Sequence, residues 1–163
     1  MSNSLITRAD GPGLNEPIVP PTRRAASEVV ACLARHARGR GEADGLDPQR
    51  VHNLLFLCQG YSLAAHGRPL FTGRLVASPG GVSCPDASDT DEDQHAGDGS
   101  EELREVVAHV WEKFGGMTPP KLQTRVQCHV WCVQEMAGGG PDLSADPEAL
   151  EKTFRMAVQE GLI

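Results

Sequence analysis

Thiol and imidazole side chains on one short stretch are the residues best suited to chemistry. Cys128 and Cys132 stand four residues apart beside His129, so on a helix both thiols share one face and could hold a metal ion with Cys84 or another histidine. Structural zinc sites usually take their ligands from short Cys-x-x-Cys turns, and this sequence contains none. We therefore expect these cysteines to be buried and reduced, and we expect neither a metal ion nor a cofactor.

A cysteine nucleophile activated by a histidine is a second chemistry to consider. Cys58 and Cys128 are the candidate thiols, and His52, His66 and His129 are the candidate bases. Sequence alone does not bring these residues together. It also lacks a nucleophile elbow, a Walker-type phosphate loop, a dinucleotide glycine fingerprint and a zinc-protease helix motif. A cysteine-dependent enzyme remains an alternative, and we expect a protein that is not an enzyme.

Carboxylates at alternate positions from Asp89 to Asp93 resemble the start of a calcium-binding loop. The pattern then fails, because its sixth position is Gln94 where a sharp turn needs glycine, and its twelfth is Ser100 where the loop needs a bidentate glutamate. Residues 83–100 hold many carboxylates and almost no bulky apolar group, so burial cannot offset the entropy lost on ordering. We expect a flexible acidic loop there.

The overall charge favours a protein partner over nucleic acid. The chain has a formal charge of −7 and a pI near 5.3, whereas nucleic-acid binders usually cluster Lys and Arg. Arg35, Arg38 and Arg40 form a locally basic stretch without interleaved aromatics, which leaves a nucleic-acid-contacting regulator of transcription or phage defence as the runner-up. The N-terminal residues lack a long apolar run, so we expect a cytoplasmic protein without a membrane span.

The elements that must position these residues are mainly helical. Residues 1–21 predict a disordered leader, and residues 22–163 predict a single helical domain. The first helix fits Thr22 as N-cap and ends near Gly39 or Gly41; its predicted apolar stripe consists of Val29, Val30, Leu33 and Ala37. The second helix has the clearest signals, with Asp47 as N-cap, Pro48 at its first position and Gly67 just past its end; its predicted core residues include Val51, Leu54, Leu55, Cys58, Tyr61 and Ala65.

Three further helices and one extended segment complete the expected fold. Residues 75–77 predict a short strand, closed by the turn-prone run 78–81. The third helix begins after Ser100 and ends at Gly115, and the fourth runs from Thr118 to the glycines at 138–140. The fifth begins after Asp146. We therefore predict a mainly α fold, a compact bundle of about five short helices with at most a small strand or hairpin element after the second helix, in which Trp111 and Trp131 belong to the core.

The run from Gln49 to Phe71, QRVHNLLFLCQGYSLAAHGRPLF, resembles the signature of the Panacea domain family, which includes SocA-type antitoxins. That signature has a leucine-rich helix start, an aromatic residue, a Gln-Gly or Gln-aromatic step, Leu-Ala, a glycine and then Pro-Leu-Phe. A Gly-Pro-Val turn follows in the family, where this chain has Gly80-Gly81-Val82. The resemblance extends more loosely over residues 25–135. This chain departs from the pattern at Arg50 and Asn53, where the family has lysines, at Ser78, where it has tryptophan, and at Gly81, where it has proline.

The resemblance implies an antitoxin that binds a cognate toxin protein encoded next door. Such a protein neutralises the toxin directly or, in the SocA type, delivers it to a Clp protease, and no catalysis is implied. The best candidates for the partner-binding surface are Tyr61, Arg68, Pro69, Leu70, Phe71, Ser78, Gly80, Gly81 and Val82. Some of these residues could have structural roles instead. Tyr61 and Phe71 could belong to the core, and Gly80 and Gly81 could be needed for backbone conformations with positive φ.

Overall fold

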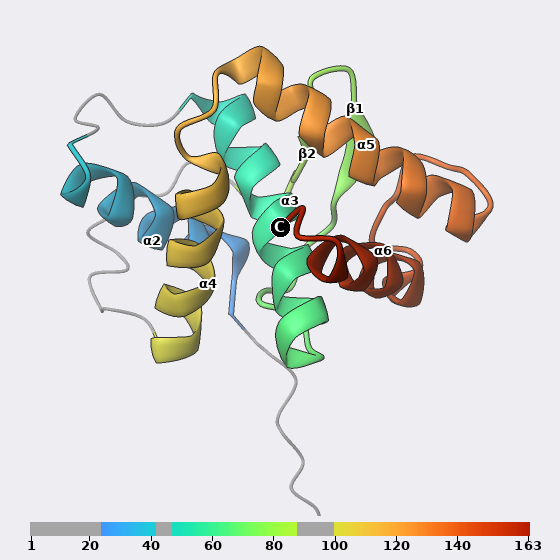
Figure 1. The fold of residues 1–163 in the computed structure, drawn as a ribbon, viewed down its shortest axis with the longest axis horizontal. Coiled ribbons are helices and arrows are strands. Elements are labelled where there is room, and N and C mark those ends of the chain that lie inside the picture. The colour runs from blue at the N-terminus through green and yellow to red at the C-terminus, as the bar shows by residue number, and fades with distance from the viewer. Residues whose placement is uncertain (1–23, 42–46, 88–99) are drawn as a thin grey trace, which may run out of the picture.

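The computed structural model describes residues 24–41, 47–87 and 100–163, and in these ranges the chain folds into five helices and one hairpin (Figure 1). This confirms the predicted mainly helical architecture with a small hairpin after the second helix. The predicted leader lies outside the described residues, as does most of the predicted acidic loop. In chain order the elements are α2 (Ala26–Gly39), α3 (Pro48–His66), β1 (Val76–Ser78), β2 (Gly81–Ser83), α4 (Glu101–Phe114), α5 (Pro119–Ala137) and α6 (Pro147–Gln159).

Helix α3 is the centre of the molecule, with α2 and α4 on one side and α5 and α6 on the other (Figure 1). The Asp47 side chain caps its start by accepting a hydrogen bond from the backbone N–H of Arg50 at 3.2 Å. Gly67 ends the helix at φ 73° and donates its N–H to the carbonyl of Leu63 at 3.1 Å. Because other helices pack on both sides of α3, every residue from Leu54 to Gly60 is buried. A helix packed on one side only would bury a single apolar stripe.

Gly60 allows α6 to approach α3 closely. A Cβ atom at this position would lie 2.2 Å from a ring carbon of Phe154 on α6. The Phe154 ring is fully buried, with Phe56 edge-on at a centroid distance of 5.2 Å and His129 of α5 stacked on it at 5.0 Å. A glycine is therefore needed where α3, α5 and α6 meet.

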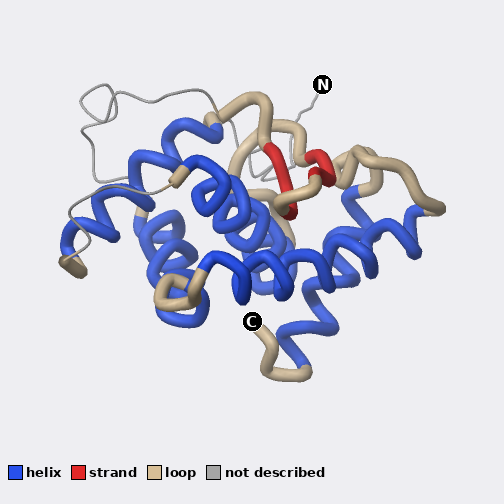
Figure 2. Tube along the Cα trace, turned by 90° about the horizontal axis from the view of Figure 1, so that it is seen from above, coloured by secondary structure: helices blue, strands red, loops and turns tan. Residues whose placement is uncertain are grey.

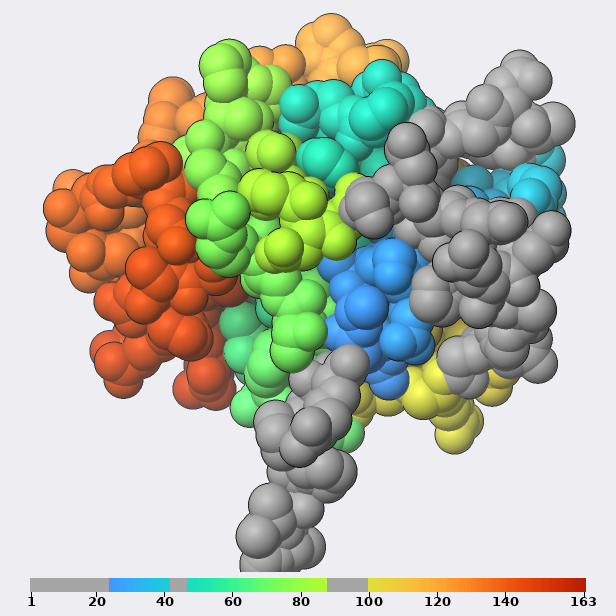
Figure 3. Space-filling model, turned by 180° about the vertical axis from the view of Figure 1, so that it is seen from behind, coloured from blue at the N-terminus to red at the C-terminus, as the bar shows by residue number. Residues whose placement is uncertain are grey.

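Polar side chains of α3 fix the hairpin, which lies on one side of the helices (Figure 2). Asn53 Oδ1 accepts the N–H of Val82 at 3.0 Å, and Gln49 Nε2 donates to the Val82 carbonyl at 2.9 Å. The strands pair antiparallel with Ala77 opposite Val82. The segment after α5 lies along β1, because the Ala77 N–H donates to the carbonyl of Pro141 at 2.7 Å (Figure 3).

Gln59 fixes the chain that follows α3. Its Oε1 atom accepts the N–H groups of Leu70 at 2.8 Å and Phe71 at 3.1 Å, and its Nε2 atom donates to the Phe71 carbonyl at 2.9 Å. Gln59 is itself buried, so three hydrogen bonds satisfy a polar side chain within the core. This pairing links the Gln-Gly step of the signature to its Pro-Leu-Phe end.

Most predicted boundaries are confirmed, and three predictions need correction. Ala65, predicted to lie in the core, is exposed. Helix α2 begins at Ala26 with Ala25 as its N-cap, so the predicted cap at Thr22, which lies outside the described residues, is wrong. The acidic loop was predicted to begin at residue 83, yet Ser83 belongs to β2 and Cys84 is fully buried. Confirmed N-caps are Asp47, Ser100, Thr118 and Asp146. Within the described ranges, no helix has both the length and the apolar character to cross a membrane.

Candidate partner-binding surface

The structure divides the nine predicted partner-binding residues by burial. Leu70, Phe71, Gly81 and Val82 are buried, and each large side chain among them is at most 1% exposed. The prediction that these four residues contact a partner is therefore corrected, because buried side chains belong to the core. Gly81 has φ 129°, and a Cβ there would lie 2.4 Å from Asn53 Oδ1, so both the backbone and its neighbour require glycine.

The remaining five residues reach the surface in two separate places. Arg68 and Pro69 follow the C-terminal end of α3, and Tyr61 is half-buried on its last turns. Ser78 and Gly80 lie beside the first turns of α3, where Asn53 Nδ2 donates to the Gly80 carbonyl at 3.3 Å. The structure therefore does not join them into one patch, and contact with a partner stays a prediction for both groups.

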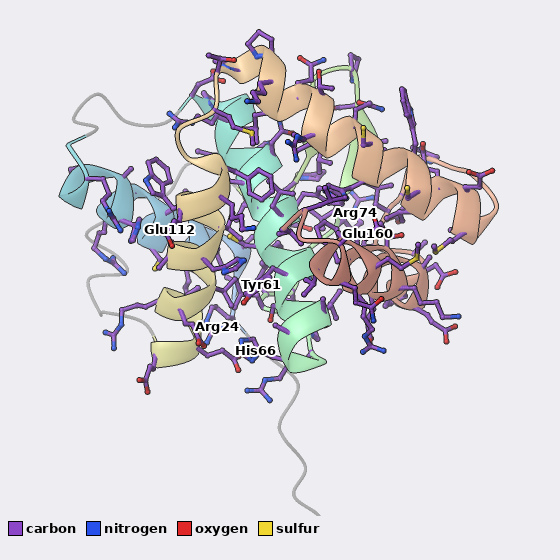
Figure 4. All side chains as sticks on the ribbon, in the orientation of Figure 1. Arg24, Tyr61, His66, Arg74, Glu112 and Glu160 are labelled. Carbon is purple, nitrogen blue, oxygen red and sulfur yellow. The ribbon has the colours of Figure 1, made fainter. Side chains whose placement is uncertain are left out.

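Tyr61 belongs to a cluster of titratable side chains between α3 and α4. Its ring stacks on His109 at a centroid distance of 4.0 Å, and His66 Nε2 lies 3.7 Å from Glu105 Oε1 (Figure 4 labels Tyr61 and His66). Arg68 forms an ion pair with Glu102 at the start of α4. Burial raises the pKa of the Tyr61 hydroxyl and lowers the pKa of His109. At neutral pH the side chains of Tyr61 and His109 are therefore uncharged, and both can donate and accept hydrogen bonds.

The candidate catalytic and metal-binding residues are dispersed. Cys32, Cys58 and Cys84 are buried, whereas Cys128 and Cys132 are exposed, so the prediction that the latter pair is buried is wrong. All five thiols are free. Burial raises the pKa of Cys58, which keeps its thiol protonated, and lowers the pKa of His129. In the ranges 24–41, 47–87 and 100–163, no three His, Cys, Asp or Glu residues are grouped so as to hold a metal ion.

The basic stretch predicted as a nucleic-acid contact lies in the last turns of α2 and just beyond them. Arg35 and His36 line a cavity of about 420 Å³ that Cys32, Arg104 and Ala108 complete. Arg104 belongs to α4, so the basic character of this cavity comes from two helices and not from one run of sequence. Arg38 and Arg40 are exposed at the end of α2. Nucleic-acid binding here stays a prediction.

An apolar groove between α5 and α6 is the surface feature that sequence reasoning missed. Trp131, which was predicted to lie in the core, is 62% exposed on α5, whereas Trp111 is buried as predicted. Met136 and Met156 are also exposed and face this groove. The residues that line it are His129, Cys132, Met136, Thr153, Met156, Ala157, Glu160 and Leu162. Cys132 and Met136 lie four residues apart, a spacing that could have revealed a second apolar edge beside the core stripe of α5.

Comparison with known proteins adds no relative, since no family model, curated protein or solved structure matches this chain. The resemblance to the Panacea domain family therefore depends on the residues quoted for it.

Proposed function

We propose that this chain is an antitoxin-like protein-binding module that neutralises a cognate toxin protein. The observation that carries the proposal is the run from Gln49 to Phe71, which resembles the family signature. Its key residues each have a defined role in the fold. Gln59 holds the Pro-Leu-Phe segment with three hydrogen bonds, Gly60 admits Phe154, and Gly67 ends the helix in a left-handed conformation. These roles support the resemblance because they depend on residue identity, not on general hydrophobicity.

Two departures from the family pattern occur at residues that contact each other. Asn53 stands where the family has a lysine, and Gly81 stands where it has a proline. In this fold the Asn53 amide lies directly against Gly81, with only 2.4 Å between Asn53 Oδ1 and the position of an added Cβ atom, and it holds the neighbouring backbone of Gly80 and Val82. In this chain the two departing residues together keep the hairpin attached to α3, so the departures do not remove the contact between these two parts of the signature.

Surface chemistry also supports a role in binding. The described surface offers half-buried aromatic and basic groups around Tyr61 and Arg68, and apolar side chains between α5 and α6. Cys58, one candidate nucleophile, is fully buried and protonated, so it cannot reach a substrate. Neutralisation then follows from occupying a surface that the toxin needs, or from presenting the bound toxin to a Clp-type protease.

Rescue of toxicity tests this function. The product of each gene adjacent to this one is expressed from an inducible promoter, with and without this chain, and colony formation is counted. We expect one product to be toxic alone and harmless with the wild-type chain. Arg68→Ala should rescue less well, whereas Arg74→Ala, an exposed arginine six residues away, is the matched control and should rescue fully. Failure of the chain to counter every neighbouring product would contradict the proposal.

The half-life of the toxin separates the two routes of neutralisation. If the chain is a proteolytic adaptor, toxin levels fall when it is present and recover in cells that lack the Clp protease. If it neutralises directly, toxin levels stay constant and the two proteins co-purify. Both outcomes agree with a toxin-binding module, and only the route differs.

A further inference from the structure

Exposed apolar side chains gather in one part of the described chain. The large ones all belong to α5, to α6 or to the residues that follow α6: Trp131, Met136, Met156, Val158 and Leu162. Three of the five, Met136, Met156 and Leu162, meet in the groove between α5 and α6. A cluster of exposed apolar side chains on a soluble domain marks a site of interaction, because isolated surface hydrophobes are common but grouped ones are costly.

The floor of this groove is fixed, and its walls can adapt. His129 and Thr153 on the floor are buried, and stacking against Phe154 at 5.0 Å holds the His129 ring. Thr153 Oγ1 donates a weak hydrogen bond to Met136 Sδ at 3.6 Å, so the floor contacts the wall. The walls carry methionines from both helices, and unbranched thioether side chains adjust their shape to different apolar partners.

A carboxylate lies at one end of the groove. Glu160, just past the C-terminal end of α6, lines the groove there (Figure 4 labels Glu160), and within the described ranges it has no ion pair. Lys113 of α4 donates instead to the carbonyl of Gly161 at 3.3 Å. The other end carries both signs, because the hollow that shares Met136 is lined by Asp146, Glu148 and Lys152, and Lys152 pairs with Glu148.

Helical backbones on both sides limit what can bind there. The backbone groups within α5 and α6 are satisfied inside each helix, so the groove offers side chains and few hydrogen-bonding groups for an incoming extended peptide. A helix satisfies its own backbone and presents an apolar stripe, which suits an apolar groove between two helices. A second copy of this chain would bring its own Glu160 to the same rim, where two carboxylates repel each other.

From this geometry we infer that the groove between α5 and α6 binds an amphipathic helix of the partner protein, with Lys or Arg at the end of its apolar stripe that faces Glu160. This inference rests on the proposed function and identifies the part of the toxin that is held. The partner's apolar side chains contact Met136, Met156 and Leu162, and its cations face Glu160.

A designed peptide tests the groove without a known toxin. The probe is a fluorescent helix of about 14 residues whose leucines recur at three- and four-residue spacing, with two lysines at one end. Fluorescence anisotropy measures its binding to the full chain. Met156→Lys should weaken binding at least about tenfold, whereas Val158→Lys should not change it. Val158 is the matched control because it is an exposed apolar residue of the same helix that does not line the groove.

Two more measurements test the charge pattern and the occupant. Glu160→Lys should weaken binding of the lysine-ended peptide and strengthen binding of a version that ends in glutamates. The inference is overturned if the peptide does not bind, or if a scrambled peptide without an apolar face binds equally well. It is also overturned if the wild-type chain is a dimer that Met156→Lys converts to a monomer, because the groove then holds a second copy.

The same variants separate failure of this inference from failure of the proposed function. If wild-type chain and Met156→Lys rescue cells from the toxin equally well, the groove is not the toxin site although the antitoxin function stands. If the peptide binds as described but no neighbouring product is countered, the groove is an interaction site and the antitoxin function fails. Circular dichroism of each variant verifies that it is folded.

Discussion

Replacing Gly60 with alanine tests the packing on which the fold depends. In the interior of an exposed helix this change stabilises a protein, because alanine has a helix propensity about 1 kcal/mol better than glycine. Here the added Cβ atom would lie 2.2–2.3 Å from three ring carbons of Phe154. Non-bonded carbons prefer roughly 3.5–4.0 Å, so the ring or the helix must move.

The ring has nowhere to move. Phe154 is fully buried, with Phe56 at one edge and the His129 ring stacked on it. Adding a carbon atom to a tightly packed core usually lowers the free energy of unfolding by up to about 3 kcal/mol. After subtracting the gain in helix propensity of about 1 kcal/mol, we expect the free energy of unfolding to fall by about 2 kcal/mol. For a chain of this length the Tm should drop by about 4 to 8 °C.

Urea denaturation followed by circular dichroism measures this change, and Gly39→Ala is the matched control. Gly39 is the last residue of α2 and has nothing within 4 Å of an added Cβ atom, so its replacement should be neutral or slightly stabilising. In a Phe154→Ala background the clash disappears, and Gly60→Ala should then stabilise by about 1 kcal/mol. If Gly60→Ala is as harmless as Gly39→Ala in the wild-type background, α3 and α6 do not pack in this way.

Four further predictions follow from the same structure. Leu55→Ala should lower the free energy of unfolding by about 2 to 5 kcal/mol, because the Leu55 side chain is fully buried. Arg68→Ala should change the free energy of unfolding by less than about 1 kcal/mol, because the ion pair between Arg68 and Glu102 is partly exposed. Urea titrations of the two variants measure both effects. A thiol-reactive chromophore should label Cys128 and Cys132 rapidly and Cys32, Cys58 and Cys84 only on unfolding, and five equal rates would contradict the burial pattern. Burial and, second, the positive charge of Arg125 lower the pKa of His129 below its ordinary value of 6.5. Below pH 6.5 the unfolded chain therefore binds a proton at His129 that the folded chain does not bind. The free energy of unfolding consequently falls as the pH falls. His129→Phe should make that fall shallower in denaturation curves, and an unchanged slope would show that His129 does not contribute. In gel shifts, an acidic protein-binding module should leave DNA unshifted, whereas a shift that weakens with salt and is lost in Arg38→Ala would favour the nucleic-acid alternative.

Much of the fold was predictable because its helices carry strong local signals. Asp47 with Pro48, Ser100, and Asp146 with Pro147 combine a capping side chain or a first-turn proline with an apolar repeat, and the structure places a helix start at each. The start of α2 was not predictable in this way. Its N-cap is Ala25, which has no side-chain oxygen, and the N3 residue Glu28 supplies the bond by accepting the Ala25 N–H at 3.3 Å.

The candidate binding surface was predicted less well, because burial depends on contacts between distant segments. Phe71 and Val82 lie in short loop and strand segments whose sequence does not indicate which side is buried. Gln59 and Gln49 donate hydrogen bonds to the carbonyls of Phe71 and Val82, and Asn53 accepts the Val82 N–H, so these segments are held in the core. Trp131 shows the opposite error. Its size suggested a core anchor, but the buried residues Val126, Val130 and Val133 occupy the inner face of α5, and Trp131 lies outside it.

Direct binding to a neighbouring gene product is the most direct test of the proposed function. The chain and each adjacent product are purified separately, mixed, and studied by isothermal titration calorimetry. We expect saturable binding to one product, with a stoichiometric heat that Arg68→Ala or Met156→Lys reduces and Val158→Lys leaves unchanged. Absence of heat with every neighbouring product, in a chain shown to be folded, would contradict the claim that this scaffold exists to hold a toxin.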